Sequence, residues 1–165
     1  MIETAALAGF WAAHGIWSVS DGETLIPILA YEHADGERGW DRYLIDDDIG
    51  VSARAAQEAF ETNEHGALRA VLVIDTYLHS DEGRRDALLV EAVRYGLEPL
   101  SIKMAVPYLP KTESSDFAVF SPKFMEDPGF DEAAVADAFF AGVDSHDHAA
   151  PVWNAHLHPS AVQEY

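Results

Sequence analysis

The hydrophobic and polar positions in the first 66 residues alternate between helical and β-like patterns. Residues 2–14 are rich in alanine, which predicts a helix that Gly15 would end. Segments 15–20, 24–33 and 40–46 have the composition of strands, and Pro27 predicts an edge strand, a bulge or a break because it lacks a ladder donor. Residues 52–65 predict a second helix, with Ser52 as its N-cap and Gly66 after its end.

The middle of the chain predicts a three-stranded antiparallel meander over residues 67–79, 86–95 and 100–108. Side chains alternate between the two faces of a strand. If the two loops centre near Glu82 and Leu97, one face of the sheet is apolar and should be covered by helices. The residues predicted for this face are Leu72, Ile74, Thr76, Leu78, Leu88, Val90, Ala92, Ile102, Met104 and Val106.

The C-terminal third predicts a short strand within 114–122 and a third helix within 131–142, which Gly142 would end. The whole pattern predicts an α+β fold in which a mainly antiparallel sheet packs against two or three helices. We expect one domain over residues 1–143. A histidine-rich arm over 144–165 would dock on this body or on a partner subunit.

Two acidic-glycine loops resemble each other at an offset of 46 residues. The segment Tyr31–Arg38, YEHADGER, and the segment Tyr77–Arg84, YLHSDEGR, share tyrosine, histidine, aspartate and arginine. Two helix–strand–strand repeats side by side would explain this match, in which case Tyr31 and His33 copy part of the surface around Tyr77. The alternative is that hairpin loops favour the same residues independently.

Residues 83–124 carry the segments GRRDALLVEAVRYG, MAVPYLPK and FAVFSPKF. In these segments the chain resembles a small uncharacterised bacterial α+β family. The resemblance implies the fold class but no activity, and it assigns no functional residue.

Composition narrows the class of protein. A chain of 165 residues that is 48% hydrophobic and 24% charged is globular and of single-domain size. The absence of cysteine excludes disulfides, thiolate metal sites and cysteine nucleophiles. No secretory signal and no apolar run of about 18 residues is present, so we expect a cytoplasmic protein without a membrane span.

The net charge of −19 disfavours nucleic acid and anionic lipid as partners. Solubility alone would account for such a charge. The alternatives are a basic protein partner and divalent-cation binding.

The tail contains two His-x-His pairs, formed by His146 with His148 and by His156 with His158. In an extended segment each pair would point the same way and could chelate a divalent metal. The alternative, which we favour, is an arm that docks through Val152, Trp153 and Leu157. No other cofactor is indicated.

A polar sheet face is the second candidate site. It would carry Asp75, Tyr77, His79, Glu91 and Lys103, a set of groups suited to general acid–base catalysis. The alternative is a solvated face on which Glu91 and Lys103 form a cross-strand ion pair.

Motifs of standard hydrolases, nucleotide-binding loops and EF-hands are absent from the sequence. We therefore expect a binding or interaction protein, in one version an acidic protein that neutralises a basic partner, and a homodimer through the tail or an edge strand. Trp40 and Trp153 are candidate anchors for a partner, although we favour the alternative that each packs in the core. The competing interpretation is a small enzyme or metal protein that uses the polar face or the tail histidines.

Overall fold

The computed structural model describes residues 1–129 and 131–158. These residues form an α+β fold with four helices and a seven-stranded antiparallel sheet, which confirms the predicted fold class. The helices are α1 (Ile2–Val19), α2 (Ile49–Thr62), α3 (Glu132–Asp144) and α4 (Ala149–His156). The strands are β1 (Ile28–Glu32), β2 (Arg38–Arg42), β3 (Arg69–Ser80), β4 (Gly83–Arg94), β5 (Leu100–Leu109), β6 (Ala118–Val119) and β7 (Lys123–Phe124).

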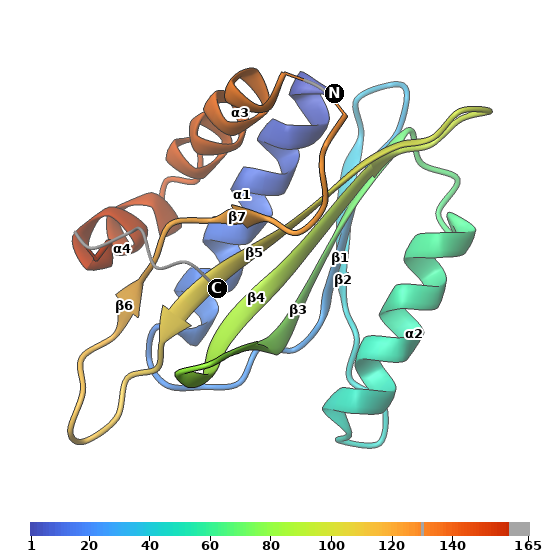
Figure 1. The fold of residues 1–165 in the computed structure, drawn as a ribbon. Coiled ribbons are helices and arrows are strands. Elements are labelled where there is room, and N and C mark those ends of the chain that lie inside the picture. Colours follow the sequence, from blue (N-terminus) through green and yellow to red (C-terminus); the bar gives the residue numbers. More distant parts are fainter. Residues whose placement is uncertain (130, 159–165) are drawn as a thin grey trace.

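The sheet runs in the order β2-β1-β3-β4-β5, and the short strands β6 and β7 both pair with β5. The long strands β3, β4 and β5 form the predicted meander. Strand β2 pairs with β1 alone and is therefore an edge strand. Helices α1, α3 and α4 lie on one side of this sheet and α2 on the other (Figure 1).

The two faces of the sheet bury separate apolar clusters. The face toward α1 contributes Ile28, Val73, Leu88, Val90 and Met104, together with further side chains from the same strands. The face toward α2 contributes Leu29, Ala70, Leu72 and Val93. Both faces are thus covered in part, whereas the sequence pattern predicted a single apolar face.

The predicted faces of β3 are wrong by one residue. Ser80 pairs with Gly83, so only Asp81 and Glu82 form the turn, and its centre lies half a residue before Glu82. Val73 consequently pairs with Val90, and Leu72 turns to the opposite face. A slip of one residue moves every side chain of a strand to the other side. The β4–β5 pairing, in contrast, centres at Leu97 as predicted.

Glycines inside the helices were misinterpreted as helix ends. Helix α1 continues through Gly15 to Val19, so the strand predicted for 15–20 is wrong. A Cβ at Gly15 would lie 2.7 Å from a methyl group of Leu88, and the glycine therefore lets the helix rest on the sheet. Gly142 likewise lies within α3, which ends at Asp144.

Helices α1 and α3 approach each other at two glycines. An ideal Cβ at Gly9 would lie 1.8 Å from the carbonyl oxygen of Phe139. One at Gly142 would lie 1.9 Å from the carbonyl oxygen of Ala6. The backbones are therefore closer here than any side chain would permit.

Three further boundaries refine the prediction. Strand β1 begins at Ile28, directly after Pro27, so the break that was one of the predicted effects of this proline shortens the strand predicted over 24–33. Helix α2 begins at Ile49 with Asp48 as its N-cap, and the hydroxyl of Ser52 is buried between the carbonyl oxygen of Asp48 and the amide of Ile45. The predicted arm contains a helix, α4, with Pro151 in its first turn, where proline is tolerated because the amide is unpaired.

The two helix–strand–strand units do occur in order, and β1 of the first pairs with β3 of the second. Their helices, however, cover opposite faces of the sheet. Tyr31 packs on the α2 side, while Tyr77 shares a face with Val73 on the α1 side. The two loops therefore do not form two copies of one surface.

Trp153 of α4 is buried in the same cluster as α1 and α3. Leu157 bridges to Val119, and the amide of His158 donates to the carbonyl of Val119. The domain boundary at residue 143 stays a prediction, and the last part of the predicted arm, 159–165, lies outside the described residues. None of the helices in the described part of the chain has the length and apolar character needed to cross a membrane.

Substituting Gly142→Ala should destabilise the protein by about 2–3 kcal/mol because the new methyl group overlaps the α1 backbone. This exceeds the gain of about 1 kcal/mol that alanine brings to a free helix. Urea unfolding measures the change. The control is Gly50→Ala in α2, where the nearest atom is 3.3 Å away and little change is expected. Unchanged stability of Gly142→Ala would contradict the proposed close contact.

Candidate functional site

A cleft of about 380 Å³ opens between the C-terminal half of α1 and the edge strand β2. Trp40 and Arg42 pair with Ala30 and Ile28, so both project from β2 on the α1 side of the sheet. His14, Trp17 and Ser18 line the facing side from α1. The loop between α1 and β1 closes the cleft with Asp21, Glu23, Thr24, Leu25 and Ile26. We call this space the aromatic–histidine cleft.

Aromatic rings surround His14. Its ring lies 5.1 Å from Trp11, 5.2 Å from Trp40 and 5.6 Å from Trp17, measured between ring centroids. Trp17 and Trp40 remain 40% and 43% exposed, although large apolar side chains are normally withdrawn from water. The cleft thus presents two accessible indoles on either side of one imidazole.

His14 is hydrogen-bonded to a second histidine, His146, which follows α3. The distance from His14 Nδ1 to His146 Nε2 is 3.0 Å. The amide of Ala149 donates to His146 Nδ1 at 3.1 Å, so this nitrogen carries no proton in the neutral ring. His146 therefore donates from Nε2, and neutral His14 keeps its own proton on Nε2. Because the bonds fix this order, the donor that His14 retains is Nε2–H, and His14 is one of the residues that line the cleft.

Both histidines are held in the neutral form. Burial lowers the pKa of His14 to about 4, and the charges of His146 and Arg42 act in the same direction. Burial also lowers the pKa of His146. A neutral imidazole pair under two exposed indoles is unusual as a purely structural feature, since perturbed pKa values gather at functional sites.

The cleft contains charges of both signs that do not pair with each other. The Arg42 side chain forms no hydrogen bond and no ion pair within 4.0 Å among the described residues. Asp21 and Glu23 line the same cleft, and the amide of Glu23 donates a hydrogen bond to a carboxylate oxygen of Asp21. The cleft therefore combines aromatic rings with charged groups of both signs.

The predicted polar sheet face is divided between the two sides of the sheet. Asp75 lies on the α1 side, where the hydroxyl of Tyr108 donates to both of its oxygens at 2.9 and 3.0 Å. Burial raises the pKa of Asp75, while the bonds from Tyr108 and from the amides of Leu25 and Thr76 oppose this shift. Asp75 thus ties β3 to β5 and to the loop that closes the cleft.

The other residues of this predicted set do not join Asp75 in a common site. Glu91 pairs with Lys103 on the α2 side, with 3.6 Å between Oε1 and Nζ, as in the alternative interpretation. Tyr77 is exposed and lies under the guanidinium of Arg84. His79 pairs with Arg84 near the end of the β3–β4 hairpin. The acid–base constellation is therefore not assembled.

The four tail histidines are also separated by their contacts. His146 uses both ring nitrogens, as described above, and His148 stacks on Trp17. His156 contacts the carbonyl of Val152 through Nδ1, and His158 lies against Phe120. Residues 1–129 and 131–158 contain no group of three or more histidine, aspartate or glutamate residues arranged to hold a metal.

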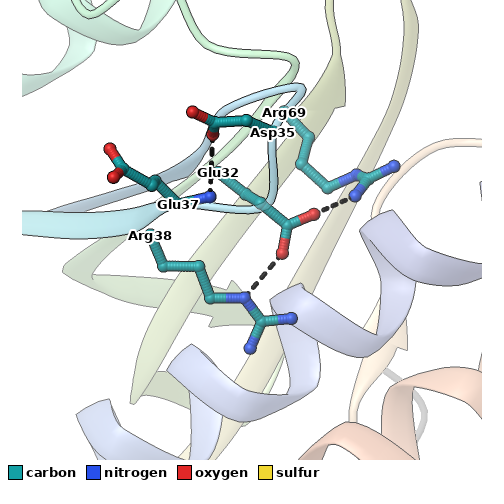
Figure 2. Close-up of polar contacts among 5 residues, drawn as sticks. All are labelled: Glu32, Asp35, Glu37, Arg38 and Arg69. Atoms are coloured by element: carbon teal, nitrogen blue, oxygen red, sulfur yellow. Dashed lines mark hydrogen bonds and ion pairs between the residues drawn. The ribbon is translucent and has the colours of Figure 1, made fainter.

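A partly buried ion-pair cluster closes the β1–β2 hairpin (Figure 2). One oxygen of Glu32 accepts from Arg38 Nε at 2.6 Å, and the other accepts from Arg69 Nη1. Nearby, Asp35 accepts from the amide of Glu37 and shapes the turn. Because both oxygens of Glu32 are engaged, this cluster joins β1, β2 and β3 rather than offering an open carboxylate.

The sequence of α1 contains a pattern that indicates the helical wall of the cleft, but the predicted end of the helix at Gly15 interrupted this pattern. Phe10, His14 and Trp17 recur at intervals of four and three residues, which places them on one face of a continuous helix. Ending the helix at Gly15 separated Trp17 from His14. No local pattern links either residue to His146, which lies 132 positions after His14.

Comparisons of the chain with protein-family models, with curated proteins and with solved structures found no significant match.

Lowering the pH should destabilise the protein through His14. The unfolded chain takes up a proton near pH 6.5 and the folded chain near pH 4. The contribution of His14 is therefore complete above pH 6.5 and is lost as the pH falls toward 4. Between pH 7 and 5 the wild type should lose about 1 kcal/mol more than His14→Asn, after solvent screening of a half-buried group is allowed for.

Asparagine is the matched variant because its side-chain oxygen keeps an acceptor for His146 but cannot be protonated. Urea unfolding at the two pH values measures both proteins. Equal losses in the two proteins would rule out the assigned role of His14.

Removing the Glu32 carboxylate should leave the charge of Arg69 without its ion-pair partner, although the Arg69 side chain is only 12% exposed. We expect Glu32→Ala to cost about 3 kcal/mol of unfolding free energy, because a buried charge loses its partner. Glu37→Ala is the control, since Glu37 is an exposed residue of the same hairpin (Figure 2). Thermal and urea unfolding of the two variants should therefore differ clearly. Similar stability of both would argue against the cluster as a structural clamp.

Proposed function

We propose that this protein is a binding protein and that a small molecule binds in the aromatic–histidine cleft. The observation that carries the proposal is the pair of exposed indoles, Trp17 and Trp40, on either side of neutral His14. The cleft volume of about 380 Å³ falls within the range of small-ligand sites, which extends from about 300 to 1,000 Å³. Such sites combine aromatic walls with a few polar groups.

The energetics of the cleft support binding rather than a purely structural role. Exposed tryptophan surface is unfavourable in water and is enriched where proteins contact partners. Arg42 is exposed and its side chain has no protein partner among the described residues, so it is available to a ligand. A ligand that covers the indoles and accepts hydrogen bonds from His14 and Arg42 would satisfy all of these groups.

Binding of a basic protein is the second candidate. The net charge of −19 supports it, because such a field steers and concentrates cationic partners. Asp21 and Glu23, beside the exposed Trp17, would give a basic surface both charge and aromatic contact. A homodimer, a cytoplasmic location and the exclusion of nucleic acid stay predictions from the sequence.

Titration with indole tests the first candidate, with the tryptophan side-chain N–H signals followed by nuclear magnetic resonance. The signals of Trp17 and Trp40 should shift, because both indoles are accessible at the cleft. The signal of Trp153, which is 1% exposed, is the internal control and should stay in place. Trp40→Ala should weaken binding about tenfold, because the loss of an aromatic contact costs about 0.5–1.5 kcal/mol in addition to the lost buried area. A titration that leaves Trp17 and Trp40 unchanged would refute the proposed site.

A further inference from the structure

The charged groups of the aromatic–histidine cleft come from different elements. Arg42 projects from β2 and His14 from α1, whereas Asp21 and Glu23 belong to the loop between α1 and β1. Arg42 is close enough to His14 for its charge to act on that ring. No ion pair within 4.0 Å joins Arg42 to either carboxylate.

Opposite charges that share a cleft without meeting can each bind a charged group on a ligand. A simple anion would be attracted by Arg42 but repelled by two carboxylates and by the net charge of −19. A simple cation would be attracted by the carboxylates but would meet Arg42. A ligand that carries both charges can pair with Arg42 and with the two carboxylates, and it remains neutral overall.

The indoles and the volume add two more requirements. Trp17 and Trp40 offer flat apolar surface to a ring, and aromatic pairs contribute beyond their buried area. A cleft of about 380 Å³ suits a molecule of amino-acid size better than a nucleotide or a folded segment. A residue inside a peptide lacks one or both of the required charges, which leaves the free amino acid.

We propose that the aromatic–histidine cleft binds a free aromatic amino acid as a zwitterion. The carboxylate accepts hydrogen bonds from Arg42 and His14, the ammonium group contacts Asp21 and Glu23, and the ring lies against Trp17 and Trp40. This inference rests on the proposed function and names the ligand class of the same site. Arginine is well matched to a carboxylate because its planar donors bind both oxygens.

Calorimetric titration with three related probes tests the inference. L-phenylalanine has both charges, 3-phenylpropionate lacks the ammonium group, and phenethylamine lacks the carboxylate. We expect L-phenylalanine to bind, and each of the other two to bind at least tenfold more weakly.

Variants that remove one charge test which protein group pairs with the ammonium group and which with the carboxylate of the ligand. The double variant Asp21→Asn, Glu23→Gln should lose the preference for L-phenylalanine over 3-phenylpropionate. Arg42→Gln should lose the preference over phenethylamine. Arg54→Gln, which removes an exposed arginine of α2, is the matched control and should keep both preferences.

The outcomes separate this inference from the proposed function. If either truncated probe binds as tightly as L-phenylalanine, the zwitterion assignment is wrong. The zwitterion assignment is also wrong if L-phenylalanine does not bind while indole still shifts the signals of Trp17 and Trp40. In that case the cleft remains a binding site. If neither indole nor L-phenylalanine binds, both proposals are wrong.

Discussion

The close contact between α1 and α3 determines the arrangement of the rest of the molecule. Gly9 and Gly142 each face a carbonyl oxygen of the opposite helix at a distance that no Cβ could occupy. Five residues after Gly9 the helix presents His14, and four residues after Gly142 the chain presents His146. The hydrogen bond between these histidines therefore follows from the helix pairing, and so does the position of α4, whose Trp153 is buried beside α1 and α3.

The sheet supplies the other wall of the cleft through its edge. Helix α1 lies mainly over β3 and β4, and β2 reaches it through Trp40, whose ring packs against Trp11 and His14. Arg42 lines the cleft that stays open beside this contact. The Asp75 carboxylate, which accepts from the hydroxyl of Tyr108, also interacts with the amide of Leu25 and so holds the loop between α1 and β1 on the sheet. A buried carboxylate that resembled a catalytic group in the sequence thus has a structural role.

Electrostatics explains why the cleft differs from the rest of the surface. The protein carries 29 acidic and 10 basic side chains. In the cleft, Arg42 lies near His14, which burial keeps neutral. The cleft thus holds an arginine charge beside two carboxylates and no imidazolium charge, which suits a ligand of mixed charge.

The sequence by itself determined the α+β class, the β3–β4–β5 meander and the third helix, because strand alternation and alanine-rich segments are local patterns. It did not determine which side chains of β3 face α1 and which face α2, since that depends on the length and centre of the β3–β4 turn. Nor did it distinguish glycines that end a helix from Gly15 and Gly142, which allow close packing between elements far apart in the chain. The cleft itself was decided only by tertiary structure, because His14, Trp40 and His146 come from three elements whose meeting leaves no local signature.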